Sequence, residues 1–379
     1  MPKSVTRTGR ATIRDVAREA GVSVTTVSHA LNGKGTASEA TRRHVLAVAE
    51  RLAYRAHPMA SALRRGQTGL IGLDMRPLDA LGSYLPAGVD YFVRFAGAAA
   101  AAALDHGFGL MLIPDLTRSD IPPAAQAVDG YVVGDPTRDD PVLARILDVG
   151  VPVVTVGRDP GRPDFIDWVG PDDAEETVRV LDHLRSCGAE RIAFLSGTDD
   201  NAWNVDSERA YRAWVRRHKL PTRVLRVPEA AGEDGGRDAA RQVLTTRRAR
   251  PDAIYCQTGR HAAGVLAEAQ LLGIRVPDDL LLAAGSDAQQ TRLAVPAITA
   301  LDLAPEETGK AAVTLLIARL TRTTTPGPVV VPAQLHLRAS TTGSGRTEPD
   351  QPAASPLSPP ARPAAGVAAA RSASRTAPA

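Results

Sequence analysis

The sequence predicts an α/β protein in which a small all-α head precedes a larger body built on parallel sheets. Three observations predict this fold class. Residues 11–53 contain three helical patterns separated by glycine-containing turns. From residue 70 onward, apolar strand patterns alternate with amphipathic helices, which is typical of parallel sheets covered on both faces. The 379 residues are also enough for two or three domains, and the body can hold two such sheets.

The first two helices of the head have clear start and stop signals. The first is expected to begin after Thr12, a good N-cap, with Asp15 in the capping-box position and Gly21 just past its end. Ser23 can then cap a second short helix over residues 24–31. A tight glycine turn therefore separates two short helices.

A third helix is expected to start near Ser38 and to run through Ala53. Its buried stripe consists of apolar side chains at helical spacing: Val45, Val48, Ala49 and Leu52. Three short helices with a tight turn between the first two describe a helix-turn-helix unit.

The second helix contains poor helix formers, in the stretch GVSVTTVSHALNG. Four of its side chains lie off the face that contains Val27 and Leu31: Val24, Thr25, Ser28 and His29. In a helix-turn-helix unit such side chains meet base edges in the major groove. Methyl groups of Val and Thr suit the thymine methyl, and a His edge can pair with guanine acceptors. An ordinary surface helix would favour Glu, Lys and Ala there, so we interpret this helix as a DNA reader.

The charge distribution agrees with a nucleic-acid partner at one end. Residues 1–66 carry 12 Lys and Arg against 4 Asp and Glu, a net of +8. Residues 67–339 carry 29 against 36, a net of −7, and residues 340–379 carry 4 against 2, a net of +2. A basic head on a mildly acidic body suggests a polyanion bound at the head, although a solvated basic surface would have the same balance.

The segment after the head, RAHPMASALRRG over residues 55–66, is interpreted as a short helix that orders on binding DNA. Pro58 suits a helix start, but the segment is too short to be stable alone in water. Leu63 next to Arg64 and Arg65 suits the minor groove, where an apolar wedge unstacks a base step. The alternative is a plain linker.

These residues resemble the DNA-binding head of the lactose/galactose/purine repressor family. The resemblance covers ATIRDVAREAGVSVTTVSHALNGKG, ASEATRRHVLAVAERLAY and HPMASALRRG. It implies a helix-turn-helix domain over 11–57 and a hinge helix over 58–66. It also implies that Val24, Thr25 and His29 take the three specificity positions, and that Leu63 opens a central C·G step. The other residues expected to contact DNA are Thr12, Ser23, Thr26, Ser28, Asn32, Ala60 and Arg64.

The resemblance continues more weakly through residues 67–339, in segments such as VPVVTVGRD, RIAFLSG and PAITALDLAPEETGKAAVTLL. It implies a two-lobed, periplasmic-binding-protein-like domain for effector binding and dimerisation. Arg209 matches an arginine that grips effector in the family, and Asp287 matches an aspartate that accepts ligand hydroxyl or ring N–H bonds. Together they could clamp a polar molecule such as a sugar. A surface or hinge salt bridge is the alternative for each.

The chain also departs from the family pattern. The usual Asn-Asp pair after the PDAI strand is Thr258-Gly259 here, which removes polar ligand contacts. The first-lobe loop RPLDALGSYLPAGVDYF is longer than usual, and Tyr91 or Phe92 could stack on a ligand ring or belong to the lobe core. Trp203 and Asp206 lie in a further candidate pocket loop. The expected effector-binding residues are Arg209, Asp287, Tyr91, Trp203 and Thr258.

The leading hypothesis is a transcriptional regulator, expected to be a repressor, whose homodimer binds a near-palindromic operator under the control of a sugar or related polar metabolite. A solute receptor would share the body but lack the basic head. An enzyme is disfavoured because we find no nucleophile elbow, phosphate loop, dinucleotide motif or His/Cys metal spacing. No cofactor is expected. A sequence-independent DNA-bundling protein remains, and specificity measurements separate it from a repressor.

Several features predict a cytoplasmic protein. No apolar run approaches the roughly 18 residues of a membrane span, and the basic N-terminus lacks the apolar core of a secretion signal. Cys187 and Cys256 are expected to be small buried hydrophobes in a reducing compartment. None of the eight His has a Cys or Ser at suggestive spacing, and His183 is expected on a helix surface. Residues 340–379 are predicted to be disordered and lack the Leu heptad of a tetramerising coiled coil.

Overall fold

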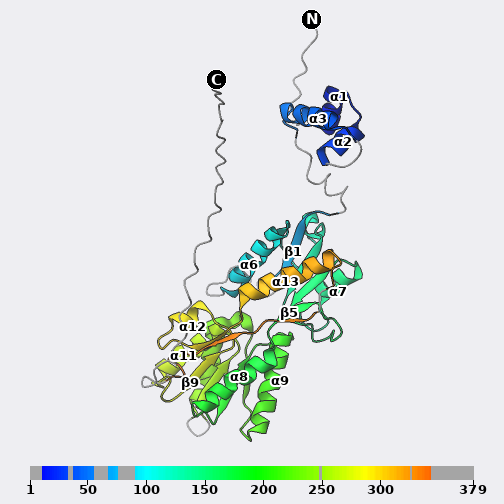
Figure 1. The fold of residues 1–379 in the computed structure, drawn as a ribbon. Helices are drawn as coiled ribbons and strands as arrows, with labels where there is room; N and C mark the ends of the chain where they lie inside the picture. The colour runs from blue at the N-terminus through cyan, green and yellow to red at the C-terminus, as the bar shows by residue number, and fades with distance from the viewer. Residues whose placement is uncertain are drawn as a thin grey trace, which may run out of the picture. The chain divides into compact units, whose positions relative to one another are not determined.

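The computed structural model of the chain describes residues 11–32, 37–54, 67–75, 90–246, 250–324 and 327–342. The head contains three helices (Figure 1): α1 (Ile13–Ala20), α2 (Val24–Asn32) and α3 (Glu39–Arg51). The predicted capping box of α1 is confirmed, because the Thr12 backbone N–H donates to the Asp15 carboxylate at 3.0 Å and the Thr12 side chain accepts from the Asp15 N–H. Gly21 ends this helix with a φ of 63°, a left-handed conformation that suits glycine.

The head has its own hydrophobic core. Its buried side chains come from all three helices: Val16, Ala17, Ala20, Val27, Ala30, Val45, Val48 and Ala49. The stripe predicted for α3 is confirmed, with Leu52 only partly buried at its end. The Ser23 hydroxyl caps α2 by accepting from the Thr26 N–H at 3.0 Å, so α2 begins where the sequence predicts.

The first lobe of the body is a six-stranded sheet in the order β11-β5-β4-β3-β1-β2, in which every paired neighbour is parallel. Its strands are β1 (Leu70–Asp74), β2 (Gly109–Ile113), β3 (Gly130–Gly134), β4 (Val153–Val156), β5 (Trp168–Gly170) and β11 (Val329–Val330). The helices around it are α6 (Tyr91–Asp105), α7 (Pro141–Asp148) and α13 (Pro305–Leu320), with the 3-10 turn η1 (Pro123–Gln126). Helices α6 and α13 share one core with the sheet, and α7 packs in a separate core on it.

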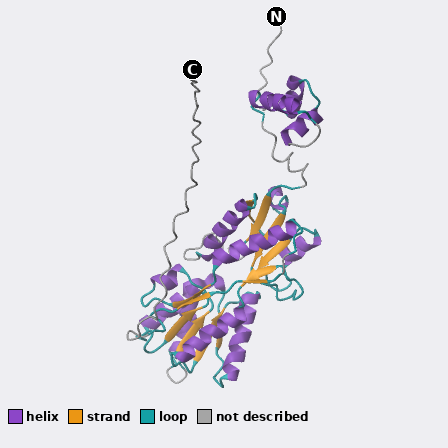
Figure 2. Cartoon of the chain, viewed as in Figure 1, coloured by secondary structure: helices purple, strands orange, loops and turns teal. Residues whose placement is uncertain are grey.

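The second lobe is a six-stranded sheet in the order β12-β10-β9-β8-β6-β7, and only the β10–β12 pair is antiparallel. Its strands are β6 (Ile192–Ser196), β7 (Val224–Arg226), β8 (Ala253–Cys256), β9 (Leu281–Ala284), β10 (Thr299–Asp302) and β12 (Gln334–His336). Its helices are α8 (Asp173–Ser186), α9 (Ala202–Arg217), α10 (Gly232–Leu244), α11 (Gly259–Leu271) and α12 (Gln289–Leu293), with the 3-10 turn η2 (Glu229–Ala231). Helices α8 and α9 share one core and α10 and α11 another, and Figure 2 shows helices around the strands of both lobes.

The chain passes between the two lobes three times, after β5, after β10 and after β11. The predicted two-lobed α/β body with parallel sheets is therefore confirmed. Because the strands of each lobe are almost all parallel, the loops at their carboxyl ends gather at one edge of each sheet. This arrangement positions the cavity described below.

Two segments differ from the sequence-based expectation. The alanine-rich stretch AGAAAAAALDHG predicts a helix over residues 96–107, but α6 begins five residues earlier because Tyr91 and Phe92 pack against the first-lobe core. Ser340 and Thr341, assigned to the tail from composition, are buried in the second lobe because the Ser340 hydroxyl donates to the Leu282 carbonyl and the Thr341 hydroxyl contacts that of Thr299 at 2.6 Å.

The cysteine and histidine expectations also need correction. Cys256 is fully buried, as expected, but Cys187 is only partly buried. His183, expected on the helix surface, is partly buried, and its Nε2 lies 2.8 Å from the Thr341 hydroxyl and 3.8 Å from the Cys187 sulfur. Cys187 directly follows α8 and lies four residues after His183, a spacing that brings side chains into contact. None of the described helices is long and apolar enough to cross a membrane.

Candidate functional site

The exposed face of α2 is the first candidate site. Val27 and Ala30 are buried in the head core, whereas Val24, Thr25 and His29 are exposed. Val24 is 42% exposed, so its apolar side chain is available to a partner, and covering it would be favourable. The predicted division of α2 into a core face and an exposed face is thus confirmed, and we call the exposed face of Val24, Thr25 and His29 the reading face.

The polar residues expected near DNA occupy helix starts in the head. Thr12 and Ser23 cap α1 and α2, and Thr26 contacts the Ser23 hydroxyl at 2.9 Å. Ser28 is partly buried, and Asn32 is the last residue of α2. Backbone N–H groups at helix starts attract phosphates, so caps at two helix starts suit contacts with a DNA backbone. Ala60, Leu63 and Arg64 of the expected hinge lie outside the described residues.

A cavity between the two lobes is the second candidate site. Its lining comes from both lobes: Asp90, Tyr91, Phe92, Asp135, Val156, Gly157, Arg158, Pro171, Asp173, Asp199, Asn201, Ala202, Trp203, Glu229, Thr258, Gly259, Arg260, Ser286, Asp287, Ala288 and Leu303. Four of the five residues expected to bind an effector are among them: Tyr91, Trp203, Thr258 and Asp287. The fifth, Arg209, is not.

Aromatic side chains form part of the cavity wall. The Tyr91 ring lies 5.5 Å from that of Phe92 in an edge-on arrangement and 6.3 Å from that of Phe95 in a stacked one. Tyr91 and Phe92 also pack on the first-lobe core, so each belongs to the core and to the cavity wall. Burial, and then the charge of nearby carboxylates, raises the pKa of Tyr91, which keeps its hydroxyl protonated at neutral pH.

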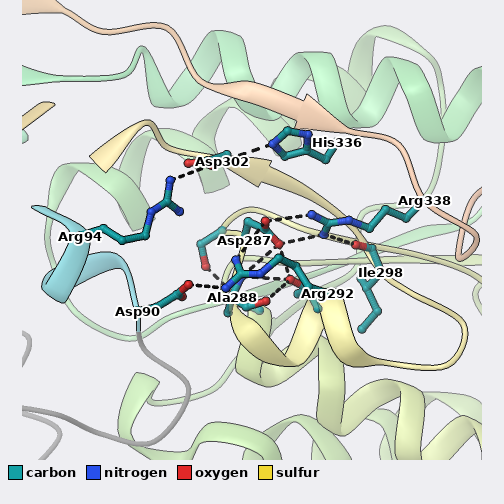
Figure 3. Close-up of polar contacts among 12 residues, drawn as sticks. Asp90, Arg94, Asp287, Ala288, Arg292, Ile298, Asp302, His336 and Arg338 are labelled. Atoms are coloured by element: carbon teal, nitrogen blue, oxygen red, sulfur yellow. Dashed lines mark hydrogen bonds and ion pairs between the residues drawn. The ribbon is translucent and has the colours of Figure 1, made fainter. Parts of the chain in front are cut away.

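Asp287 lines the cavity, but arginines already hold its carboxylate (Figure 3). Arg338 donates to both of its oxygens at 2.8 and 2.9 Å, Arg292 donates at 3.2 Å, and the Thr291 hydroxyl donates as well. Burial favours a higher pKa for Asp287, but hydrogen bonds from Arg338 and Thr291 outweigh it and lower the pKa to about 2. The salt-bridge alternative given above for Asp287 therefore describes its present partners.

Asp287, Asp302 and His336 form the one group among the described residues whose ligand atoms approach as closely as a metal site requires, within 4.8 Å of one another. Figure 3 shows Asp302 between Arg94 and His336. Guanidinium groups thus lie against both carboxylates, and their positive charges oppose a metal cation there. We interpret this cluster as an ion-pair network.

Arginine–aspartate pairs join the lobes at the edges of the cavity. Arg158, which follows β4, donates to Asp206 of α9 at 2.5, 2.7 and 3.0 Å. Arg292 of α12 pairs with Asp90 at the start of α6. Arg138 and Asp200, each on a loop of a different lobe, pair at 2.8 Å.

Arg209 lies away from the cavity. Its side chain is 68% exposed and pairs with Asp206 at 2.9 Å on the same helix. Trp203, which does line the cavity, is six residues earlier on α9, and six residues turn a helix by about 240°. The two side chains therefore point to different sides of the helix.

Sequence reasoning missed most of the charged residues of the cavity. Asp135 comes directly after β3 and takes a φ of 41°, a left-handed conformation uncommon for residues other than glycine. Asp173 is the first residue of α8, and Glu229 is the third residue after β7. Their place just after apolar strands was the available signal, because the carboxyl ends of parallel strands meet at a common edge.

Comparisons with known proteins follow the same division of the chain. Residues 12–57 match the family model described as bacterial regulatory proteins, lacI family, and residues 181–341 match a periplasmic binding protein-like domain. The chain is 32% identical over 346 residues to the HTH-type transcriptional regulator PtxS of Pseudomonas aeruginosa, covering 88% of this chain and 96% of that protein. It is 27% identical over 318 residues to the transcriptional repressor PurR of Yersinia pestis, covering 82% and 90%.

Solved structures share the fold. The lac repressor dimer bound to operator and an anti-inducer superposes with a TM-score of 0.72 at 21% identity, covering 88% of this chain and 99% of that one. The transcriptional regulator CelR in complex with cellobiose superposes with a TM-score of 0.63 at 25% identity, covering 87% and 100%.

A helix-turn-helix head followed by a two-lobed body with a cavity defines the class of ligand-controlled transcriptional regulators. The length and identity of the match to PtxS, together with the model that matches the head, assign the chain within this class. The chain belongs to the lacI family of bacterial regulatory proteins, which are DNA-binding transcriptional regulators controlled by small-molecule effectors.

Proposed function

We propose that this protein is a transcriptional repressor that binds a near-palindromic operator as a homodimer and changes its operator affinity when a small polar molecule binds in the cavity. The exposed reading face of α2 carries this proposal, because it presents Val24, Thr25 and His29 together off the head core, a set of side chains that suits base edges in the major groove. The protein would act in the cytoplasm and without catalysis. The proposed domains are the head over 11–57, the hinge over 58–66 and the body from residue 67 to about 340.

In this proposal Val24, Thr25 and His29 read base edges. The hydroxyls of Thr12, Ser23, Thr26 and Ser28, with Asn32, position the head on the phosphates. In the hinge, Ala60, Leu63 and Arg64 would enter the minor groove at the centre of the operator. Leu63→Ala should then weaken operator binding and relax the preference for a central C·G step, and an unchanged affinity would refute the hinge role.

A homodimer is supported by exposed apolar side chains on the second lobe. Leu271 of α11, Leu293 of α12 and Val295 are 72, 71 and 80% exposed, and Leu293 and Val295 line a groove beside α11. Exposed apolar side chains that line a common groove, as Leu293 and Val295 do, are typical of protein–protein interfaces. Two heads joined through their bodies would read the two halves of a palindrome.

The effector is proposed to bind between the lobes, with Tyr91, Trp203, Thr258 and Asp287 around it. Thr258 offers a hydroxyl that also caps α11, accepting from the His261 N–H at 3.2 Å. We assign Arg209 no contact with the effector and propose that Arg158 contacts it instead, because Arg158 lines the cavity and Arg209 does not. Closure of the lobes around the effector would move the first lobes and so the spacing of the hinges, a coupling between two sites.

The test is to retain fragmented genomic DNA on the purified full-length protein at about 150 mM salt and to sequence it, because nonspecific binding falls steeply with salt. Retention of a shared near-palindrome with a central C·G step is the expected result. Retention of DNA without a common motif would leave only phosphate binding by a basic head. If a shared near-palindrome is recovered, the genes beside its sites would indicate which small molecules to test as effectors.

A further inference from the structure

The cavity carries an excess of negative charge. Two arginines line it, Arg158 and Arg260. The carboxylates that line it are six: Asp90, Asp135, Asp173, Asp199, Glu229 and Asp287. Arginines on neighbouring elements neutralise part of this set, since Arg292 pairs with Asp90 and Arg338 with Asp287. Conversely, Asp206 engages Arg158 through both of its oxygens.

Two of the remaining carboxylates have no countercharge in contact. Within the described part of the chain, Asp135 and Asp173 have no ion pair and no side-chain hydrogen bond. Asp135 belongs to the first lobe. Asp173 is the first residue of α8, where the chain enters the second lobe. Their charges therefore meet across the cavity, and like charges that face each other repel.

Glu229 adds a third negative charge that is hydrogen-bonded but not neutralised. Its carboxylate accepts from the Asn204 side chain at 2.6 Å and from the Thr198 N–H at 3.2 Å. Any side chain at Gly197 would collide with this carboxylate, so the backbone closes over it. Glu229 is thus fixed in place without a cation.

The electrostatic effect of this arrangement appears at Asp135. Burial, then the charges of Asp199 and Glu229, raises its pKa to about 7. Burial and the charge of Asp135 likewise raise the pKa of Asp173, while Arg158 opposes that rise. Arg260 is the other lining cation, and its guanidinium lies against Gly232 at the start of α10.

An unused donor and an aromatic surface complete the cavity. Asn201 is 7% exposed; its side-chain oxygen caps α9 at 2.9 Å, and its NH₂ group donates no hydrogen bond within the described residues. This buried amide, in the cavity wall, points to a ligand with an acceptor oxygen. Trp203, Tyr91 and Phe92 supply aromatic rings, whose faces attract cations.

We propose that the effector is a small organic cation, a protonated amine that also carries hydroxyl groups, with its ammonium group between Asp135 and Asp173. The inference rests on the proposed function, because it names the chemical class that the same cavity binds. An ammonium group supplies the missing countercharge. The Asn201 NH₂ group donates a hydrogen bond to a hydroxyl oxygen of the ligand, and the aromatic rings cover its carbon skeleton. Because the carboxylates come from both lobes, the cation also removes the repulsion that opposes closure.

The test uses matched probes that differ by one amine for one hydroxyl and whose amines are protonated at pH 8: 3-aminopropane-1,2-diol against glycerol, and 4-aminobutan-1-ol against butane-1,4-diol. Binding to the full-length protein is measured by calorimetry at pH 8 and constant ionic strength. We expect an amine to bind at least about tenfold tighter than its neutral partner, the effect of one desolvated charge pair. Asp135→Asn with Asp173→Asn should abolish this preference, and Asp105→Asn, an exposed carboxylate on α6, should keep it.

A second measurement needs no ligand. If Asp135 carries an uncompensated charge, Asp135→Asn should raise the melting temperature of the free protein at pH 8 by about 2 °C or more and change it little at pH 4, where the carboxyl is protonated. A lower or unchanged melting temperature at pH 8 overturns the proposal. So does the absence of any preference for an amine probe, or a preference that the double variant retains.

Retention of operator DNA by the same preparations separates this inference from the function on which it rests. If wild-type protein retains a shared palindrome but prefers neutral probes, the cation is refuted and the repressor stands. If no shared sequence is retained, the proposed function itself fails.

Discussion

The reading face of α2 and the cavity between the lobes are built in opposite ways. The reading face comes from nine consecutive residues, Val24–Asn32, on a single helix. The cavity draws its lining from residues between Asp90 and Leu303 in both lobes. A site on one helix depends on the local helical repeat and one small core, whereas a site between lobes depends on how two sheets and three chain crossings are placed. The two sites should therefore respond differently to mutation.

The largest effect is expected from Val27→Asp in the head. Val27 is fully buried, and an unpaired carboxylate there should cost more than about 4 kcal/mol, which a core this small cannot absorb. Operator retention should disappear, while the melting of the body and its binding of cavity ligands stay unchanged. If the body unfolds together with the head, the two sites do not respond independently to mutation.

The largest effect on the cavity side is expected from Arg338→Ala, which leaves the Asp287 carboxylate buried without its bidentate partner. The unfolding free energy of the body should fall by about 3–5 kcal/mol at pH 7. Because the folded pKa of Asp287 is lowered to about 2, the wild type owes this stability to the charged form and loses it as the pH falls from about 4 toward 2. The two melting curves should therefore converge at acid pH.

Arg275→Ala is the matched control for this experiment. Arg275 and Asp279 also form a bidentate pair, but on the protein surface. The loss in melting temperature at pH 7 should be far smaller than for Arg338→Ala. Equal losses would mean that burial of Asp287 does not set the cost.

The substitutions Arg158→Ala and Arg209→Ala test which of the two arginines belongs to the cavity. Both arginines contact Asp206, but Arg158 lines the cavity and joins the lobes, whereas Arg209 is largely exposed. Arg158→Ala should change the affinity for a cavity ligand by about 1–3 kcal/mol, and Arg209→Ala by less than about 0.5 kcal/mol. Calorimetry with one ligand on both variants tests this difference. A larger loss of affinity in Arg209→Ala than in Arg158→Ala would mean that Arg209 contacts the ligand.

The smallest effect is expected from Val24→Ala on the reading face. If Val24 covers a thymine methyl, the variant should lose about 1 kcal/mol or more of discrimination at one symmetric pair of operator positions. The fold of the head should not change, because Val24 is exposed. Sequencing of retained DNA measures the preference position by position, and an unchanged profile would remove the contact.

The sequence predicts the head almost completely because its determinants are local. The capping box of Thr12 and Asp15, the positive φ of Gly21 and the exposure of His29 all follow from residues within one or two helical turns. The alternation of strands and helices likewise predicts both sheets. The start of α6 was missed because contacts with the lobe core, which no local pattern contains, extend the helix to Tyr91.

The cavity could be predicted only in part. Tyr91, Trp203, Thr258 and Asp287 do line it, but the sequence could not reveal that Arg338, fifty-one positions from Asp287, holds that carboxylate. Asp135 and Asp173 meet because β3 and α8 lie at the same edge of the lobes, a contact set by tertiary packing. Arg209 was misplaced because its direction depends on the helix turn between it and Trp203.

The three passages between the lobes have a consequence for how the protein is made on the ribosome. The first-lobe core includes α13 and Val331, and the second-lobe sheet requires β12, so neither lobe can be completed before residues beyond 330 have been synthesised. The head core uses residues 13–54 only and can form as soon as it emerges from the ribosome. A nascent chain therefore carries a folded head well before the cavity between the lobes has formed.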